Sequence, residues 1–535
     1  MEAMDYDYIV VGAGSAGAVV ANRLSADPRH KVLLLEAGPA GSAWSIVPVG
    51  YARMIANPAV NWLYTAEPEA NTGGRRIPVP RGRLLGGSSS LNGLAFVRGQ
   101  AQDFDTWAQM GNHGWAYEDV LPFFRKMETY QGGGDDRFRG RDGPLRVTDP
   151  PARDPFYRAV IEAAGQVGIA HNPDYNGARQ DGIAMSQATI ASRRRMSTAR
   201  CYLDSARKRP NLRIETGALT LGLTFDGKRC TGVRCRLGDD IHEARAGRDV
   251  VVSAGSINSP QLLELSGIGQ PDRLRALGIE VRHALQGVGE NLRDHYAPRT
   301  RWSVGAPGYV YNDTARGLGW VRQGLRYLLT GEGLLGMVGA PIRAFVRSRE
   351  GLAAPDLLLG WVPMLTEPGP SGPRIARQSG FTCYAHPMRP ESRGNIHIVS
   401  SDPAAAPAIR FNFLSAPVDA ALTVRAIAIA RSIMTAPAMA PLKLGEMAPG
   451  RERTTDAEII DWVKATAETT YHPVGTCKMG NDAAAVVDAK LRVHGISGLR
   501  IADASIMPTL TSGNTNAPTI MIGEKAADLV LRDAA

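Results

Sequence analysis

The chain has few cysteines and no pattern typical of a metal site. Its 535 residues include 5 cysteines, with no Cys-x-x-Cys pair, and 10 histidines, none at the His-x-x-x-His spacing. A disulfide framework and a structural zinc site are therefore disfavoured, and we expect no metal. So few thiols suit a reducing compartment, which favours a cytoplasmic location.

Long apolar runs are also missing. No stretch of about 18 apolar residues is free of charges and helix breakers, so the sequence predicts no transmembrane segment. The apolar stretch that starts at Tyr8 does not resemble a signal peptide, because Glu2, Asp5 and Asp7 flank it and patterned glycines follow. Peripheral attachment to the inner membrane stays open, since the net charge is +9.

Clusters of one charge sign are absent as well. The 61 Lys and Arg residues and the 52 Asp and Glu residues are dispersed, and the longest basic run is Arg193-Arg194-Arg195. No stripe of alternating basic and aromatic residues appears. The sequence therefore predicts no nucleic-acid partner.

What the chain does have is length and glycine. Its 535 residues exceed one ordinary compact domain, and its 59 glycines indicate many tight turns and close backbone approaches, as a large cofactor needs. In the region 300–465 prolines multiply and amphipathic segments such as 418–434 appear. This change indicates a second domain.

The N-terminal segment predicts a β-α-β unit. Residues 7–11 and 31–36 are apolar enough for strands of a covered parallel sheet, with a helix through Leu24 between them. Further strands are expected at 212–215 and 249–253. A helix is expected to begin at Ser259-Pro260, and another to run from Ala517 to Leu531.

A glycine pattern sits at the first turn of this unit. Gly12, Gly14 and Gly17 follow the first strand, and Glu36 ends the second. These glycines allow a pyrophosphate to approach the N-terminus of the helix, and the carboxylate would accept hydrogen bonds from ribose hydroxyls. The pattern predicts a bound dinucleotide without choosing between NAD and FAD, and Glu36 disfavours a 2′-phosphate.

Three more motifs follow along the chain. Residues 82–93, GRLLGGSSSLNG, can direct backbone N–H groups at an anion or a ring carbonyl. Residues 255–269, GSINSPQLLELSGIG, indicate a turn, a helix and a glycine stop, and 287–292 form another turn. Residues 471–476, YHPVGT, and 514–516, NTN, place one histidine and two asparagines near the C-terminus.

Together these segments resemble the glucose-methanol-choline (GMC) oxidoreductases, flavoenzymes that oxidise alcohols, and most closely their choline-dehydrogenase-like branch. The resemblance runs from Tyr6 to Leu531. It implies an α/β fold: a Rossmann-type FAD-binding domain and a second α+β substrate-binding domain on an antiparallel sheet. We expect FAD-binding segments at 1–155, 196–300 and 466–535, and substrate-domain segments at 156–195 and 301–465.

The resemblance also implies the site. It makes His472 and Asn516 the catalytic pair. The residues it assigns to FAD binding are Gly12, Gly14, Ser15, Ala16, Gly17, Glu36, Ala37, Arg83, Gly86, Gly87, Ser88, Asn92, Gly93, Leu219, Asp503, Ala504, Asn514 and Thr515.

The chemistry of the pair is intelligible. A histidine with an ordinary pKa near 6.5 can accept the hydroxyl proton of an alcohol, and an asparagine amide can donate to the developing alkoxide. The expected reaction is oxidation of a primary alcohol to the aldehyde, with hydride transfer to flavin N5 and electrons passed to an acceptor other than oxygen, such as a quinone. Alternatives are an oxidase that makes hydrogen peroxide, a hydroxynitrile lyase, a photodecarboxylase and a non-catalytic flavin protein.

Two positions depart from the family. Leu91 stands where some members carry a histidine that binds FAD covalently, so we expect non-covalent FAD. Choline oxidisers carry a glutamate in the segment that here reads APIRAFVRS (340–348), which has no carboxylate. Choline is therefore disfavoured, and Arg343 lies either on the surface or in the pocket, where it would favour a neutral or anionic alcohol.

Overall fold

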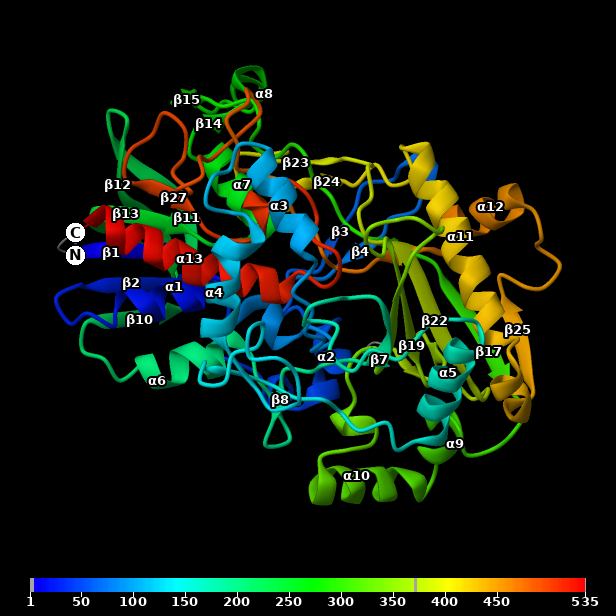
Figure 1. The fold of residues 1–535 in the computed structure, drawn as a ribbon. Coiled ribbons are helices and arrows are strands. Elements are labelled where there is room, and N and C mark those ends of the chain that lie inside the picture. The colour runs from blue at the N-terminus through cyan, green and yellow to red at the C-terminus, as the bar shows by residue number, and fades with distance from the viewer. Residues whose placement is uncertain (1–3, 370–372, 535) are drawn as a thin grey trace.

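The computed structural model describes residues 4–369 and 373–534. Its helices and strands form two sheets side by side, each with its own helices, and both termini lie at the far end of the first sheet (Figure 1). The helices are α1 (Gly17–Leu24), α2 (Tyr51–Met54), α3 (Ala101–Gln109), α4 (Tyr117–Met127), α5 (Pro155–Gln166), α6 (Asp204–Ala206), α7 (Gly255–Leu265), α8 (Pro271–Ala276), α9 (Tyr311–Thr314), α10 (Gly319–Thr330), α11 (Pro417–Met434), α12 (Asp456–Thr466) and α13 (Asn516–Ala534).

The first sheet has seven strands and is mostly parallel at its centre. β10, β2, β1, β13 and β27 pair in parallel, and β11 and β12 add an antiparallel edge through β13. Helices α1, α4 and α13 pack together over it. Its strands are β1 (Met4–Val11), β2 (Val32–Glu36), β10 (Leu212–Thr216), β11 (Ala218–Asp226), β12 (Arg229–Leu237), β13 (Asp240–Val252) and β27 (Leu499–Ile501).

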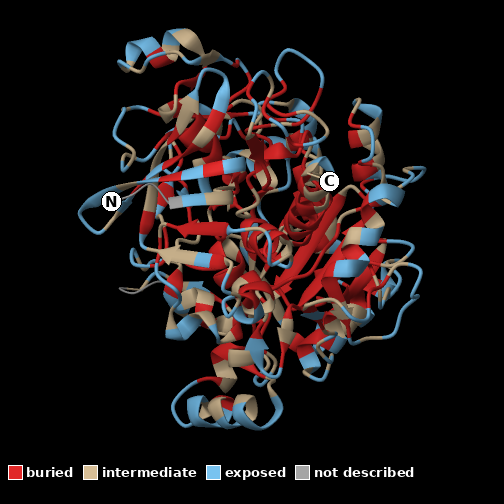
Figure 2. Cartoon of the chain, turned by 90° about the vertical axis from the view of Figure 1, so that its left-hand side faces the viewer, coloured by how far each residue is buried: buried red, intermediate tan, exposed pale blue. Residues whose placement is uncertain are grey.

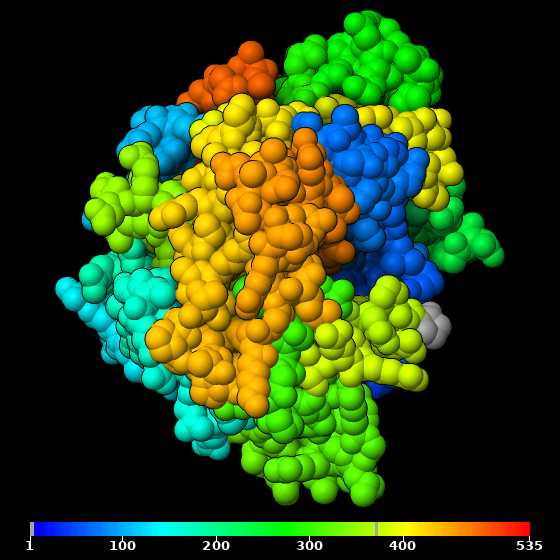
Figure 3. Space-filling model, turned by 90° about the vertical axis from the view of Figure 1, so that its right-hand side faces the viewer, coloured from blue at the N-terminus to red at the C-terminus, as the bar shows by residue number. Residues whose placement is uncertain are grey.

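The second sheet has six antiparallel strands in the order β25-β17-β22-β19-β18-β7. They are β7 (Gly182–Met185), β17 (Arg299–Val304), β18 (Ile342–Val346), β19 (Leu357–Val362), β22 (Gly380–Pro387) and β25 (Leu444–Ala448). Helices α5 and α11 pack against this sheet and share a buried apolar core with it. The buried residues concentrate along both sheets in Figure 2, and Figure 3 shows α11 and α12 (yellow and orange) across the outer face of this half.

Short strands make up the remaining pairs. They are β3 (Tyr64–Thr65), β4 (Pro78–Val79), β5 (Glu128–Tyr130), β6 (Leu145–Val147), β8 (Ile190–Ala191), β9 (Arg194–Arg195), β14 (Ile268–Gly269), β15 (His283–Ala284), β16 (Tyr296–Ala297), β20 (Thr366–Glu367), β21 (Arg374–Ile375), β23 (Asn395–His397), β24 (Ala408–Arg410) and β26 (Glu468–Thr469).

The predicted fold class is confirmed: a Rossmann-type sheet lies beside an antiparallel sheet. The strand β7 belongs to the predicted segment 156–195 and pairs with β18 of the second sheet. β17 begins at Arg299, two residues before the predicted start of the substrate domain at 301. The exact domain boundaries stay a prediction.

One helix begins earlier than the sequence predicts. Helix α7 starts at Gly255, and Pro260 lies inside it rather than at its first turn. A proline inside a helix lacks the N–H that would bond the carbonyl four residues back, here that of Ser256. Thr476 Oγ1 donates to that carbonyl at 2.6 Å and so replaces the missing bond. A long-range side chain therefore makes the earlier start possible.

Helix α10 projects from the body and turns its apolar side chains outward. Among the described residues, no helix is long and apolar enough to cross a membrane. The exposed fractions in and next to α10 are nevertheless high: 87% for Leu318, 60% for Val321, 53% for Leu325 and 62% for Leu328. These positions recur at helical spacing and so form one stripe. Figures 1 and 2 show the helix at the lower end of the molecule, largely exposed.

Candidate active site

Glycines bring three backbone segments together at the end of β1. Gly12 has a φ of +95°, and a Cβ there would lie 2.5 Å from the carbonyl oxygen of Ser253. A Cβ on Gly17 would lie 1.9 Å from the carbonyl oxygen of Gly12, and one on Gly87 would lie 2.7 Å from the Cα of Gly14. Only glycine allows the segment 82–93 to cross the turn that precedes α1 at this distance.

This crossing closes one end of a long cavity of about 410 Å³. At this end, Glu36 accepts hydrogen bonds from the backbone N–H groups of Ala13 (3.1 Å) and Gly38 (2.9 Å), and burial raises its pKa to about 7. Ser256 also lines the cavity, and its buried Oγ has no hydrogen-bond partner within the described chain. A glycine cradle, a helix N-terminus and an unpaired hydroxyl fit a dinucleotide.

Most of the residues predicted to bind the cofactor line this cavity. They are Gly12, Gly14, Ser15, Ala16, Glu36, Ala37, Gly87, Ser88, Asn92, Gly93, Leu219, Asp503, Ala504, Asn514 and Thr515. Three of the predicted residues are not among those that line the cavity: Gly17, Arg83 and Gly86. The Asp503 carboxylate accepts from Gly255 N, Ser259 Oγ and Ser505 N, so it holds the start of α7 in place.

His472 stands at the other end of the cavity, where the first sheet meets the second. Its backbone N–H donates to Asp294 Oδ1 at 2.9 Å. The preceding residue, Tyr471, has a φ of +69°, which is costly for a tyrosine. Arg81 donates to the Tyr471 carbonyl at 2.6 Å, and Thr469 Oγ1 accepts from the Tyr471 N–H at 2.8 Å. A strained turn that is held in this way fixes the position of the imidazole.

Hydrogen bonds also select the tautomer of His472. His295 Nε2 lies 2.8 Å from the carbonyl oxygen of Met388, which can only accept, so this nitrogen carries the proton. The neutral His295 then has an acceptor at Nδ1, which lies 3.1 Å from His472 Nδ1. His472 Nδ1 is therefore the protonated nitrogen, with Thr470 Oγ1 as a second partner at 2.8 Å. Its Nε2 is then the unprotonated nitrogen, which can accept a hydrogen bond or a proton.

The asparagine in contact with His472 is Asn514, and not Asn516, which the resemblance pairs with His472. Asn514 Nδ2 lies 2.9 Å from His472 Nε2. Asn516 Oδ1 instead accepts from Ser15 Oγ at 2.8 Å, in the glycine-rich turn that precedes α1. The difference arises because α13 begins at Asn516, so its side chain leaves the helix start toward α1, while Asn514 precedes the helix.

Arg343 lies in the cavity and not on the surface. Its side chain is 1% exposed on β18 and lines the cavity next to Asn514. Arg343 Nη1 donates to Asn514 Oδ1 at 2.7 Å, and Nε donates to Ser186 Oγ at 2.8 Å. Because Asn514 accepts from Arg343 through its oxygen, its Nδ2 must face His472.

The environment of His472 keeps it neutral. Burial lowers the pKa of His472 well below its ordinary value, and the charges of Arg81 and Arg343 lower it further. Burial likewise lowers the pKa of His295, and it lowers the pKa of His386 to about 4. The imidazole is therefore a proton acceptor at neutral pH.

Sequence reasoning missed several residues that hold this site. Arg195, buried on β9, donates to Asn92 Oδ1 at 2.8 Å and to the Asn92 carbonyl at 2.7 Å. Asp294 and His295, which directly precede β16, support His472 from 178 and 177 residues away. Two sequence features could have indicated these residues. The basic run at 193–195 contains Arg195, and an acidic residue and a histidine, Asp294 and His295, follow the turn at 287–292.

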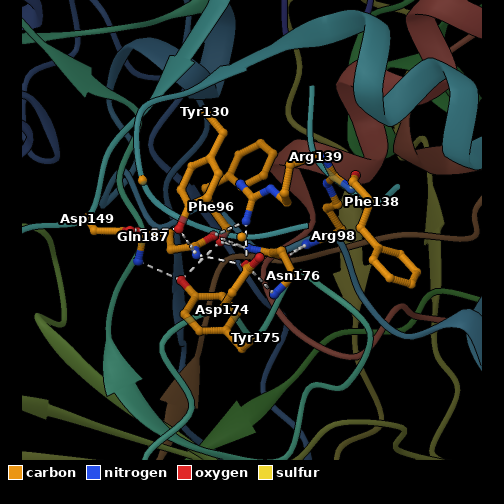
Figure 4. Close-up of polar contacts among 12 residues, drawn as sticks. Phe96, Arg98, Tyr130, Phe138, Arg139, Asp149, Asp174, Tyr175, Asn176 and Gln187 are labelled. Atoms are coloured by element: carbon orange, nitrogen blue, oxygen red, sulfur yellow. Dashed lines mark hydrogen bonds and ion pairs between the residues drawn. The ribbon is translucent and has the colours of Figure 1, made fainter. Parts of the chain in front are cut away.

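A buried ionic network fixes the chain beyond Asn92 (Figure 4). Arg98 donates to Glu128 at 2.5 Å, and Arg139 bridges Glu128 at 2.9 Å and Asp174 at 2.5 Å. Arg139 also bonds Gln187, whose backbone carbonyl accepts from Phe96 N. Figure 4 shows these side chains converging between segments of both halves. The network ties the segment after the glycine-rich crossing to the second sheet.

A dinucleotide cavity that also holds a neutral histidine and an amide, beside an antiparallel sheet, is the arrangement of a two-domain, dinucleotide-dependent oxidoreductase. The comparisons place it further: residues 6–297 and 390–523 match the two family models described as GMC oxidoreductase. The chain belongs to the GMC oxidoreductase family, and it is an FAD-dependent oxidoreductase acting on CH–OH donors.

Similar proteins agree with this assignment to the family. The chain is 43% identical to a protein of Klebsiella pneumoniae subsp. pneumoniae named oxygen-dependent choline dehydrogenase, across 98% of this chain and 96% of that protein. Pyridoxine 4-oxidase from Mesorbium loti is 30% identical with a TM-score of 0.87, covering 98% of both chains. Formate oxidase of Aspergillus oryzae RIB40 is 25% identical with a TM-score of 0.90, covering 100% of this chain and 99% of that one.

We expect denaturation to release FAD from the protein as an intact, unbound molecule. Leu91, at the position where some relatives carry a linking histidine, lines the cavity with a hydrocarbon side chain that cannot bond to the flavin. Acid precipitation should therefore release all yellow colour into the supernatant, and the mass of the chain should stay at 57.3 kDa. A pellet that retains the flavin, or a chain heavier by the mass of FAD, would contradict this expectation.

Proposed function

We propose that the chain oxidises a primary alcohol to the aldehyde, with His472 as the base that takes the hydroxyl proton. The observation that carries this proposal is the neutral His472 Nε2, which faces Asn514 Nδ2 at 2.9 Å at the end of the cofactor cavity. FAD, when bound, supplies the two-electron oxidant that accepts a hydride from the carbinol carbon at flavin N5. The substrate thus loses one proton and one hydride.

The residues of this chain divide the work between them. The alcohol hydroxyl donates to His472 Nε2 and accepts from Asn514 Nδ2, in place of the hydrogen bond that these two atoms make with each other. The proton then goes to the imidazole, and the amide stabilises the alkoxide. Thr470 and His295 hold the proton on Nδ1, so Nε2 stays unprotonated and can act as the base. Arg343 keeps the amide turned toward the substrate.

The direct test is the anaerobic spectrum of the holoprotein in the dark with a panel of alcohols. Bleaching of the oxidised-flavin band by one class of alcohol supports the proposal. Absence of bleaching by linear, aromatic and polyol alcohols contradicts it, and favours the lyase or photodecarboxylase alternatives.

The electron acceptor is a further part of the proposal. We infer a non-oxygen acceptor such as a quinone. The name of the Klebsiella relative, oxygen-dependent choline dehydrogenase, and the two oxidases among the solved structures support the hydrogen-peroxide alternative. Reoxidation of the bleached protein separates the two. Faster reoxidation by a soluble quinone than by air-saturated buffer supports the acceptor proposed here, and rapid peroxide formation favours the oxidase.

Helix α10 supports a peripheral location on a membrane. Its exposed apolar stripe is flanked by the exposed arginines Arg316 and Arg322 and by the β8–β9 hairpin, where Arg193 and Arg194 are exposed. No Asp or Glu occurs from 314 to 331, and Arg326 pairs with Asp154 at 2.8 Å. An apolar stripe between positive charges suits an anionic lipid surface, and 12 residues are too few to span it.

We expect the holoprotein to float with vesicles that contain phosphatidylglycerol and to float less with pure phosphatidylcholine. Leu325→Glu and Leu328→Glu together should abolish flotation without changing FAD content. The control is Ile241→Glu, which alters an equally exposed apolar residue (58%) on β13. No flotation of the unchanged protein would overturn the membrane proposal. Dimerisation that the α10 variant abolishes would assign the stripe to a second copy instead.

A further inference from the structure

Arg343 is a buried charge that no carboxylate compensates. Arg343 is 1% exposed, and its two hydrogen-bond partners, Ser186 Oγ and Asn514 Oδ1, are both neutral. Across the described residues, no Asp or Glu forms an ion pair with it, and its Nη2 makes no hydrogen bond. Burying an unpaired ion costs several kcal/mol, so a ligand that carries the opposite charge would find a prepared site here.

The other arginines at this end of the cavity are already compensated. Arg299 forms an ion pair with Glu468 at 2.9 Å. Arg81 donates to the carbonyl groups of Pro80 and Tyr471 and lies in the field of Asp294. Arg343 differs from both because it lines the cavity without any acidic partner.

The acidic residues of the cavity lie elsewhere. Glu36 and Asp503 are the carboxylates in the described lining. Both belong to the cofactor end, where backbone N–H groups occupy them. The substrate end therefore offers positive charge and amide groups, and it offers no free carboxylate to a cationic substrate.

We propose that the substrate is an alcohol that carries a carboxylate, which pairs with Arg343 while its hydroxyl contacts His472 and Asn514. This inference rests on the proposed function. The Nη1 and Nη2 edge of a guanidinium matches the two oxygens of a carboxylate. Because one amide group alone separates Arg343 from His472, the hydroxyl and the carboxylate are joined by a short carbon chain.

The first test compares substrates that differ only in charge. In this test the holoprotein is mixed with hydroxy acids of three to six carbons that end in a primary alcohol, and separately with the matching methyl esters. We expect kcat/KM for the acids to exceed that for the esters at least about 10-fold. Arg343→Gln should bring the ratio close to one, and Arg343→Lys should retain part of it.

The ratio is the decisive quantity, because Arg343 also orients Asn514. Loss of that orientation slows both members of each pair, so it cancels from the ratio. A variant that slows acid and ester equally would show that Arg343 acts on Asn514 or on the cofactor alone, which overturns the inference. Preference of the unchanged protein for choline or for the esters would overturn it as well.

A second measurement does not need turnover. Butyrate, which cannot be oxidised, should perturb the flavin absorbance of the holoprotein, whereas butyramide should not, and Arg343→Gln should weaken butyrate binding at least about 10-fold. Butyrate binding through Arg343 in a protein that no alcohol reduces would keep the anion site and reject the proposed function. Reduction by alcohols without any butyrate binding or acid preference would keep the function and reject the anion site.

Discussion

Replacing His472 with alanine should slow anaerobic flavin reduction by about 10²–10⁴-fold and leave FAD bound. The variant removes the group that accepts the hydroxyl proton, while the glycine cradle and Glu36 at the other end of the cavity stay intact. Stopped-flow absorbance at saturating alcohol measures the rate, and the flavin-to-protein ratio measures cofactor content.

Two controls separate proton transfer from a loss of structure. His242→Ala changes a histidine on β13 outside the cavity and should reduce at the normal rate. Added imidazole should restore part of the rate of His472→Ala, since the cavity left by the side chain can hold a free base. Unchanged reduction kinetics in His472→Ala would remove the residue from the mechanism.

The pH dependence follows from the same group. The pKa of His472 is lowered in the folded protein, so the imidazole is already neutral at pH 6.5, where an exposed histidine is half protonated. The rate of flavin reduction should therefore stay constant as the pH falls to 6.5 and decline only at lower pH. A decline with its midpoint above 6.5 would show that another group, or a charged His472, controls the step.

Local patterns in the sequence are enough to predict the part of the cavity near the glycine-rich turn. The run from Gly12 to Gly17, the acid at Glu36 and the crossing at Gly87 act through backbone geometry within short segments, so their spacing predicts them. The apolar strands at 7–11 and 31–36 form β1 and β2 for the same reason. These features need only the residues next to them in the chain.

The support of His472 could not be predicted in this way, because it depends on a pairing across the chain. The two-residue strands β16 and β26 pair antiparallel, with Tyr296 opposite Thr469. This pairing brings His295 to His472 and leads Thr470 N to donate to the His295 carbonyl. Neither strand has a length or an alternation that marks it in the sequence.

Which of the two asparagines contacts His472 could not be predicted for a related reason. Asn514 and Asn516 flank one threonine, and the motif alone does not say which of them precedes the helix. The turn at Gly513, with a φ of +135°, and the start of α13 at Asn516 decide it. A Cβ on Gly513 would lie 2.5 Å from Val97 Cγ1, so the segment 93–100 sets this turn.

The two asparagines should therefore give opposite phenotypes. Asn514→Ala removes the donor at the developing alkoxide and the link between Arg343 and His472, so flavin reduction should slow about 10²–10³-fold with FAD affinity unchanged. Asn516→Ala removes the acceptor for Ser15 at the turn of α1 and should weaken FAD binding while the bound fraction reduces at nearly the normal rate.

Stopped-flow reduction and FAD titration of the stripped protein measure both effects on both variants. Asn514→Asp serves as the matched variant, because it keeps the shape of the side chain but replaces the donor with an acceptor, and it should be as slow as Asn514→Ala. If Asn516→Ala slows reduction more than Asn514→Ala, the catalytic partner is the residue that the sequence alone suggested, and the hydrogen bond between Asn514 and His472 serves only to orient the imidazole.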